Sequence, residues 1–343
     1  MKKTKIKRSI TIAALGKKFN YGAHINAFTE FFITRGFNVN YILNKEFYPP
    51  KFYKHVSFMK SDDLFLIFPF KEMLFYSLIR WIFNKKTYYW FHEPFESYTI
   101  YRESGNSFFW ITQFFLKSLY SYFTCYFCNI VFLPSDSAIK NYTKSKLFFK
   151  KIKFVKFPLI YPDRIDFTKK EKLVSYIGTI SKDHAFDSFI KMIMNNESLL
   201  FKYNFKLLIA TSSRIDKVYL DRLESLSINT QIIHSRSIKE KDMDSYYSRT
   251  LFLWNAYRRT TQSGVLVNGF RHNCIPIFQK ESFNYDYRNI CLLVNSNKYL
   301  INLDDFNFVL KNIKIIYKLI SDLYLKNYSY KSVLRSQIFR NEV

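Results

Sequence analysis

Two arginines and a serine–glycine pair lie close together in the second half of the chain. Arg258 and Arg259 stand a few residues before Ser263 and Gly264. A Ser-Gly pair is typical of a helix start, where unpaired backbone N–H groups and the positive end of the helix dipole can bind an anion. Guanidinium groups bind phosphate through forked hydrogen bonds. These residues therefore predict a phosphate site, and an ordinary capped helix beside two solvated arginines is the alternative.

The neighbouring residues predict the elements that would position this site. The apolar run 250–254 is typical of a buried parallel strand. Apolar residues at helical spacing follow Gly264, and residues 275–278 (Ile-Pro-Ile-Phe) begin the next strand. The sequence thus predicts one strand–helix–strand step, with the phosphate at the start of its helix.

Strand and helix patterns alternate along the whole chain. We expect further strands within residues 9–15, 35–43, 63–68, 87–91, 130–133, 173–178, 205–210, 231–234 and 290–294, and residues 153–158 to close the first domain. We expect further helices at 23–34, 71–83, 112–126, from 136, 186–194, 213–225, 239–248 and 304–325. On helix 71–83, Leu74, Leu78 and Ile82 should face the core. The alternation predicts an α/β chain with a doubly wound parallel sheet in each half.

Length and composition agree with two globular domains. A chain of 343 residues is long enough for two cores, and 48% apolar residues exclude a disordered chain. The polar, unpatterned residues 161–171 are the best linker candidate. We therefore predict domains at 1–160 and 172–325, with a tail, 326–343, that could pack back on the first domain.

Residues 257–278 resemble the nucleotide-sugar-binding region of the group one glycosyltransferases, in particular those that build bacterial surface polysaccharides. The match consists of Tyr257, the run Thr261, Gln262, Ser263, Gly264 and Val265, and the strand that starts at Pro276. The resemblance implies the GT-B fold, in which two Rossmann-like domains with doubly wound parallel sheets face a central cleft. It also implies that Tyr257, both arginines and residues 261–265 bind the donor.

The start of the second half departs from the family pattern. Gly178 ends a predicted strand, as in the family, but the two cations that hold the donor diphosphate there are Thr179 and His184 here. Ala185 replaces a family glycine. Lys182 and the two arginines could supply the lost charge. The resemblance implies donor contacts for Gly178 and His184, and a donor contact for Lys182 is our hypothesis.

Two carboxylates of the family's retaining members are also missing. The corresponding positions are Thr260 and Asn268. The Asn268 amide can hydrogen-bond sugar or ribose hydroxyls, but it cannot ionise. Asn268 is therefore a candidate catalytic residue, and the stereochemical outcome stays open.

Candidate residues of the first half follow its predicted strands. His92 and Glu93 come directly after strand 87–91, where a parallel sheet binds ligands. We expect His92 to contact the sugar or the acceptor and Glu93 to act as a base, with two capped loop residues as the alternative. Gly22 and His24 stand where the family places a glycine loop against the donor and acceptor, although Ala23 replaces a second glycine.

A metal site is not expected. Asp242 and Asp244 have the Asp-x-Asp spacing of GT-A enzymes, but they open a predicted helix, so we interpret them as an N-cap and a solvated carboxylate. Cys125 and Cys128 have metal-ligand spacing without a second pair. We interpret the cysteines as buried thiols and predict neither metal nor cofactor.

The formal net charge of +26 favours an anionic partner. Lysines mixed with aromatic residues over 144–156 suit an anionic membrane surface, although nucleic acid would feel the same field and a merely solubilising surface is the third possibility. Residues 107–133 predict a buried or membrane-touching helix more than a span. No signal peptide is visible, so we expect a cytoplasmic protein, peripheral on the inner membrane face.

Together these observations predict a metal-independent hexosyltransferase. It would move a sugar from a nucleotide sugar to a lipid-linked or oligosaccharide acceptor in O-antigen or capsule synthesis, without a specific nucleic-acid partner. The alternative is a non-catalytic basic module with the same fold that binds an anionic membrane or RNA.

Overall fold

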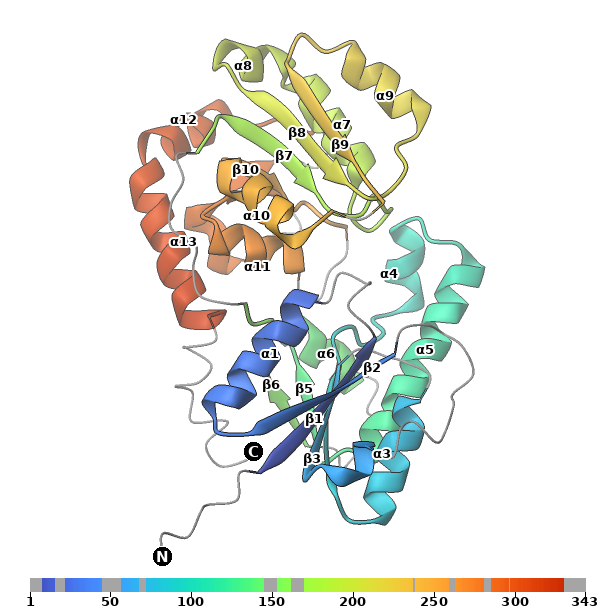
Figure 1. Ribbon diagram of the computed structural model, residues 1–343. Coiled ribbons are helices and arrows are strands. Elements are labelled where there is room, and N and C mark those ends of the chain that lie inside the picture. The colour runs from blue at the N-terminus through green and yellow to red at the C-terminus, as the bar shows by residue number, and fades with distance from the viewer. Residues whose placement is uncertain are drawn as a thin grey trace, which may run out of the picture. The chain divides into compact units, whose positions relative to one another are not determined.

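The computed structural model describes residues 8–15, 22–44, 57–67, 72–144, 153–161, 170–236, 238–258, 263–280, 285–295 and 297–329. The chain divides between residues 162 and 163 into two units, and the second unit also takes in Glu103–Gly105 and ends at Ser329 (Figure 1). The predicted tail begins inside a helix, and its residues 330–343 lie outside the described part of the chain.

The described strands of the first unit form one six-stranded parallel sheet in the order β2-β1-β3-β4-β5-β6. They are β1 (Ser9–Leu15), β2 (Asn38–Asn44), β3 (Asp63–Ile67), β4 (Lys86–Trp90), β5 (Ile130–Leu133) and β6 (Phe154–Lys156). The helices are α1 (Gly22–Thr34), α2 (Ser57–Lys60), α3 (Met73–Ile82), α4 (Tyr98–Glu103), α5 (Phe108–Tyr126) and α6 (Asp136–Lys144).

Alternate residues of these strands pack against helices on opposite faces of the sheet. On one face Phe28 of α1 meets Phe65 and Trp90 at ring-centroid distances of 4.8 and 5.3 Å. On the other face Leu64 and Leu66 share a core with residues of α3, α5 and α6. Because both faces are covered, the central strands are apolar throughout, which is why their runs were recognisable in the sequence.

Helix α3 does not bury the predicted face. Met73, Tyr76, Ser77 and Arg80 point inward, whereas Ile82, which we expected in the core, is exposed and Leu74 and Leu78 are half-buried. The reason is a buried guanidinium. Arg80 donates hydrogen bonds of 2.6 to 3.2 Å to the carbonyls of Phe58, Ser61, Asp62 and Lys86 and to the Thr87 hydroxyl. Burial lowers the pKa of Arg80 to about 10, so the group stays charged near neutral pH.

The second unit contains a six-stranded parallel sheet in the order β12-β11-β10-β7-β8-β9. Its strands are β7 (Leu173–Ile177), β8 (Lys206–Thr211), β9 (Thr230–His234), β10 (Phe252–Trp254), β11 (Ile275–Gln279) and β12 (Leu292–Val294). Its helices are α7 (Phe186–Asn195), α8 (Glu197–Lys202), α9 (Lys217–Glu224), α10 (Glu240–Arg249), α11 (Gly264–Arg271), a 3-10 helix (Tyr285–Ile290), α12 (Leu303–Lys311) and α13 (Ile313–Asn327).

The predicted helix 304–325 is in fact two helices. Asn312 ends α12 and precedes α13, and both its backbone N–H and its side-chain amide donate to the Phe308 carbonyl at 3.0 and 2.9 Å. An asparagine that bonds its own preceding turn competes with the next helical hydrogen bond, which explains the break.

Each sheet has a point where the strand order reverses. In the first sheet it lies between β1 and β3, and in the second between β7 and β10. Open α/β sheets bind ligands outside the carboxyl ends of the strands at this point. The loops 16–21 and 68–71, which follow β1 and β3, lie outside the described residues. The loop that begins at Gly178 is described, and so are residues 255–258 of the loop that follows β10.

Within the described ranges, no helix combines the length and the apolar character needed to cross a membrane.

Candidate functional site

The residue that ends β7 lies against the first turn of α11. Gly178 has a φ of +129°, a backbone conformation that essentially only glycine adopts. A Cβ atom at this position would lie 3.4 Å from Cγ2 of Val265. Two of the predicted donor residues, 87 positions apart by their numbers, are therefore neighbours at the reversal point of the second sheet.

Ser263 is the N-cap of α11, as the Ser-Gly pair predicts. Its hydroxyl accepts from the Leu266 N–H at 3.1 Å and from the Asn255 amide at 3.0 Å. Ser263 and Asn255 are both buried. The cap is therefore held from the helix and from the end of β10, and it fixes the direction of the helix dipole at this edge of the sheet.

Asn255 was not singled out in the sequence. Its side-chain oxygen is buried and has no hydrogen-bond partner in the described part of the chain. A polar residue directly after the apolar strand Phe252–Trp254 is the signal that could have pointed to it, since ligand contacts follow the carboxyl ends of parallel strands.

A glycine on α11 brings the helix close to the sheet. A Cβ atom on Gly269 would lie only 2.5 Å from Cδ2 of Leu253 on β10. No side chain larger than hydrogen fits there without movement of the helix or of Leu253. Gly269 therefore sets how closely the second half of α11 packs on β10.

His184, which replaces a family cation, stacks on Tyr257. The two ring centroids are 4.4 Å apart, and the Nδ1 atom of His184 lies 2.7 Å from the Thr179 carbonyl. A carbonyl only accepts, so Nδ1 carries a proton and Nε2 can accept a hydrogen bond. The Trp254 indole donates to the His184 carbonyl at 3.1 Å. Burial raises the pKa of the Tyr257 phenol, which therefore stays protonated.

Arg258 is already engaged with the loop that precedes α7. Its Nη2 atom lies 2.5 Å from an Asp187 carboxylate oxygen, and Nη1 donates to the Lys182 carbonyl at 2.8 Å. Its backbone N–H also donates to the Asp183 carbonyl at 2.8 Å. The guanidinium thus holds residues 182–187 in place, and a phosphate bound by Arg258 would compete with Asp187. Asp187 is a second contact that the sequence did not reveal.

Only some of the remaining predicted donor residues lie in the described part of the chain. The side chain of Lys182 is exposed. Gly264 and Val265 form the first turn of α11 and are half-buried. Arg259, Thr261 and Gln262 lie outside the described residues, as does Thr260.

Asn268 lies on the second turn of α11 and is half-buried. Its side-chain oxygen is buried without a hydrogen-bond partner among the residues that the structure describes. A buried acceptor of this kind normally has a hydrogen-bond partner.

In the first unit, His92 and Glu93 directly follow β4. His92 is largely buried beside Trp90, with ring centroids 5.2 Å apart, and its Nδ1 atom lies 3.8 Å from a Glu93 oxygen. That distance permits an ion pair when His92 is protonated but is too long for a hydrogen bond. Gly22 and His24 lie in the first turn of α1, and the loop before them is outside the described residues.

Asp244 is not the solvated carboxylate that we expected. One of its oxygens lies 3.2 Å from Nη1 of Arg271 and 3.1 Å from Nε2 of His272. The N-cap of α10 is Lys239. Asp244 thus ties α10 to the end of α11, a contact between distant segments that the local pattern could not show. In the described ranges, no group of three or more His, Cys, Asp or Glu side chains is placed to hold a metal ion.

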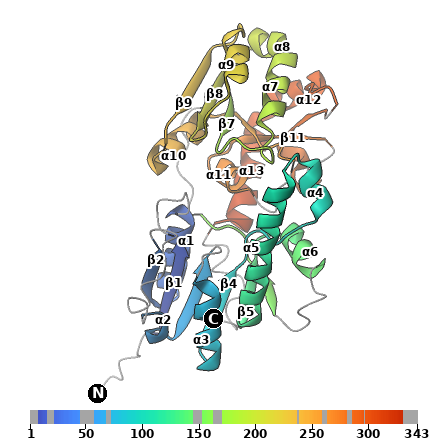
Figure 2. The ribbon, with the colours of Figure 1, turned by 90° about the vertical axis from the view of Figure 1, so that its right-hand side faces the viewer.

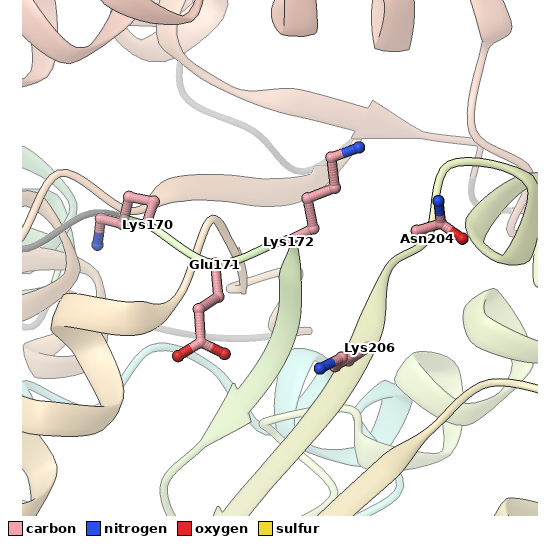
Figure 3. A pocket seen from close by; sticks show the side chains of 5 residues that line it. All are labelled: Lys170, Glu171, Lys172, Asn204 and Lys206. Atoms are coloured by element: carbon pink, nitrogen blue, oxygen red, sulfur yellow. The ribbon is translucent and has the colours of Figure 1, made fainter.

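A cavity of about 410 Å³ lies at the opposite edge of the second sheet, next to the amino ends of β7 and β8 (Figure 3). Its lining residues are Lys170, Glu171, Lys172, Asn204 and Lys206. Lys170 and Lys172 point apart in Figure 3, and Glu171 pairs with Arg249 at 2.6 Å. The charged groups therefore do not converge on one ligand. Because the cavity lies at the amino ends of the strands, it is separate from the candidate site at their carboxyl ends.

No protein-family model and no curated protein sequence matches the chain. Solved structures are similar over nearly its whole length. Sucrose-phosphate synthase from Thermosynechococcus elongatus has 11% identity and a TM-score of 0.65, with 97% of this chain and 98% of that chain covered. A putative UDP-N-acetylglucosamine 2-epimerase from Listeria monocytogenes has 7% identity and a TM-score of 0.62, with 96% and 95% covered. WaaG, a glycosyltransferase involved in lipopolysaccharide biosynthesis, has 13% identity and a TM-score of 0.55, with 92% and 94% covered.

At these identities the likeness speaks for the fold and not for one activity. The similar structures include both glycosyltransferases and an epimerase, and all of them match the two parallel sheets described above. The strand orders, the reversal points and these similarities lead to one conclusion, which is that the chain has the GT-B fold.

Proposed function

We propose that the protein is a glycosyltransferase that takes its sugar from a nucleoside diphosphate. The observation that carries this proposal is the start of α11 at the reversal point of the second sheet. There the Ser263 cap, Gly178 and the stacked His184 and Tyr257 surround backbone donors at the positive end of a helix dipole. Such an end suits a diphosphate, and the fold shared with sucrose-phosphate synthase and WaaG supports this choice of ligand.

Sugar transfer from such a donor needs little covalent chemistry from the protein. The leaving nucleoside diphosphate gains negative charge in the transition state, and fixed donors aimed at it lower the barrier. The backbone at the start of α11, His184 and the arginines at 258 and 259 would supply these donors without a metal ion. Asn268 would hydrogen-bond a hydroxyl of the sugar or the ribose.

For the acceptor we propose a lipid-linked oligosaccharide of O-antigen or capsule type. We assign its contacts to His92 and Glu93, together with Gly22 and His24. Glu93 would accept the proton of the attacking hydroxyl, because carboxylates within hydrogen-bond reach of a substrate hydroxyl can act as bases. The enzyme would work on the cytoplasmic face of the inner membrane.

A thermal-shift panel of nucleoside diphosphates and nucleotide sugars, measured with EDTA present, tests this proposal. A ligand that binds only the folded protein stabilises it by about 2.7 kcal/mol at 100 times its dissociation constant. We expect one nucleoside diphosphate and its sugar to raise the melting temperature. If no member of the panel does so, the donor site assigned here is wrong.

A second function, a non-catalytic basic module, is favoured by one observation: the Arg258 guanidinium is paired with Asp187 instead of standing ready for a phosphate. Product analysis separates the possibilities. A transferase releases the nucleoside diphosphate when an acceptor is present, an epimerase changes the sugar but releases no diphosphate, and a binding module does neither.

A further inference from the structure

The longest described helix of the first unit exposes a row of apolar side chains. Phe109, Leu116 and Phe123 of α5 are 71%, 57% and 46% exposed. They are seven residues apart, so they lie on one side of the helix. The buried side of α5 carries Ile111, Ser118, Ser121, Tyr122, Thr124 and Cys125. The more apolar face of this helix is therefore the one that its own sheet does not cover.

Helix α3 extends the same surface. The hydrogen bonds of Arg80 fix its rotation, and as a result Trp81, Ile82 and Phe83 point outward with exposures of 57%, 58% and 62%. The two helices are packed together, since Trp81 meets Phe127 just beyond α5 at 5.6 Å and the Tyr120 hydroxyl bonds the Leu74 N–H at 3.2 Å. Figure 2 shows α3 and α5 on the side of the first unit that faces the viewer. We call this surface, made of the exposed residues of α3 and α5 and of Phe83, the aromatic face.

The charges of the aromatic face have one sign. Neither α3 nor α5 contains an aspartate or a glutamate. Lys117 is exposed in the middle of α5, and Lys86 is exposed three residues after Phe83. Large apolar side chains exposed together on two packed helices mark an interaction site. The lysines of this region, Lys117 and Lys86, favour an anionic partner.

We infer that the aromatic face docks on the surface of an anionic lipid bilayer. Aromatic side chains beside lysines are the composition of membrane-interface segments, and two adjacent helices present a raised surface that can enter the headgroup layer without a matching groove. A helix of 19 residues spans about 28 Å, so α5 can lie along the bilayer over its full length.

This inference deepens the proposed function, since it rests on that function for the membrane-bound acceptor. It places the membrane contact on α3 and on α5, which lies within the segment 107–133 predicted to be buried or membrane-touching, and not on the segment 144–156, of which residues 145–152 lie outside the described part of the chain.

Co-sedimentation with vesicles tests the inference. The vesicles are equal parts phosphatidylglycerol and phosphatidylcholine, with pure phosphatidylcholine for comparison. The variant Phe109→Ser/Leu116→Ser/Phe123→Ser should lose about tenfold or more in partitioning to the anionic vesicles. The matched control Phe308→Ser/Ile315→Ser/Leu319→Ser changes equally exposed residues on α12 and α13 and should partition like the parent protein. Equal partitioning of the first variant and the parent, or equal losses in both variants, would overturn the inference.

Tryptophan fluorescence gives a second test, which does not depend on a variant's fold. Of the four tryptophans, Trp90 and Trp254 are buried, whereas Trp81 and Trp110 are exposed on α3 and α5. Anionic lipids brominated in their acyl chains should quench the emission of the parent protein. A Trp81→Phe/Trp110→Phe variant should still bind vesicles, but its emission should be quenched much less than that of the parent protein. Quenching that is unchanged in this variant would contradict the inference.

Two further measurements separate this inference from its alternatives. Sedimentation velocity without lipid should show the same monomer for the parent and the Ser variant, and a dimer lost in the variant would assign the aromatic face to a second copy of the chain. The thermal-shift response to the nucleoside diphosphate should be the same in both proteins. If neither protein responds but vesicle binding still depends on the aromatic face, the donor assignment fails and the membrane surface stands.

Discussion

The carboxyl edges of the two sheets differ in the kind of contact that joins their candidate residues. At the second sheet, Ser263, Arg258 and His184 each make at least one hydrogen bond to a neighbouring loop or strand end. At the first sheet, His92 packs beside Trp90, and its Nδ1 atom lies 3.8 Å from a Glu93 oxygen. An anion site works by fixed donors, which the hydrogen bonds of the second sheet provide, whereas a histidine and a carboxylate at this separation can tighten their contact when a substrate binds.

The two units also differ in what organises them. In the first unit a buried arginine fixes the rotation of α3 and turns apolar residues outward. In the second unit a glycine and a capping serine position α11 at the sheet edge. In both units a few specific residues decide how a helix is placed, whereas apolar patterning decides the strands.

The largest effect should come from Arg80→Met in the first unit. The substitution keeps the apolar volume but leaves several carbonyls without their donor, and breaking such a buried charged network costs about 3–5 kcal/mol. Urea unfolding followed by circular dichroism measures the loss. Nucleoside-diphosphate affinity should stay within about twofold of the parent wherever the second unit remains folded. A parallel loss of affinity would show that the contrast between the units is false.

Gly269→Ala should be the most damaging small substitution in the second unit. The new Cβ atom would lie 2.5 Å from Leu253, and overpacking of this kind costs about 1–3 kcal/mol. Denaturant melts of Gly269→Ala, Leu253→Ala and the double variant form a cycle. Because Leu253→Ala removes the clashing atom, the double variant should be more stable than the sum of the single effects indicates. Simple additivity would rule out the close approach as the reason for the glycine.

Arg258→Ala should weaken nucleoside-diphosphate binding about tenfold, or about 1.4 kcal/mol, as measured by calorimetry. The informative partner variant is Asp187→Asn, which removes the ion pair but keeps the shape. If Arg258 binds the phosphate, freeing it from Asp187 should leave affinity at least as tight as in the parent. Weaker binding in both variants would instead mean that the pair acts by holding residues 182–187.

Ser263→Ala should cost about 1 kcal/mol of stability through the lost N-cap and should also weaken nucleotide binding. Ser107→Ala is the matched control, since Ser107 caps α5 in the first unit by accepting from the Trp110 N–H at 3.3 Å. Both variants should lose similar stability in thermal melts, but only Ser263→Ala should bind the diphosphate less tightly. Equal affinities would remove the start of α11 from the donor site.

The strands and the capped start of α11 could be predicted because each depends on local sequence. Apolar runs between polar loops mark buried strands, and a Ser-Gly pair marks an N-cap. The inward face of α3 could not be predicted from apolar periodicity. It depends on the buried Arg80, whose guanidinium donates hydrogen bonds to backbone carbonyls between residues 58 and 86.

The contacts of the candidate site were also beyond local patterns. Arg258 meets Asp187 across 71 positions, and Asp244 meets His272 across 28. Such pairs depend on which loops the sheet order brings together, and that order follows from the whole topology. Asn255 is the exception, since its place at the end of a strand was visible.

The smallest predicted effect is a loss of folding stability at acidic pH. Burial lowers the pKa of His272 below its usual 6.5, and its hydrogen bond to Asp244 only partly offsets this. The unfolded chain then binds a proton at a higher pH than the folded protein does, so this contribution to stability is complete above about pH 6.5 and is lost as the pH falls through the lowered pKa. Melting temperatures recorded from pH 7.5 to pH 5 should therefore decline more steeply in the parent than in His272→Gln, which cannot take up the proton. Because Asp244, Arg271 and His272 all belong to the second unit, the difference should appear in that unit's transition; an identical pH profile in both proteins would mean that the buried imidazole is protonated as readily in the fold as in the open chain.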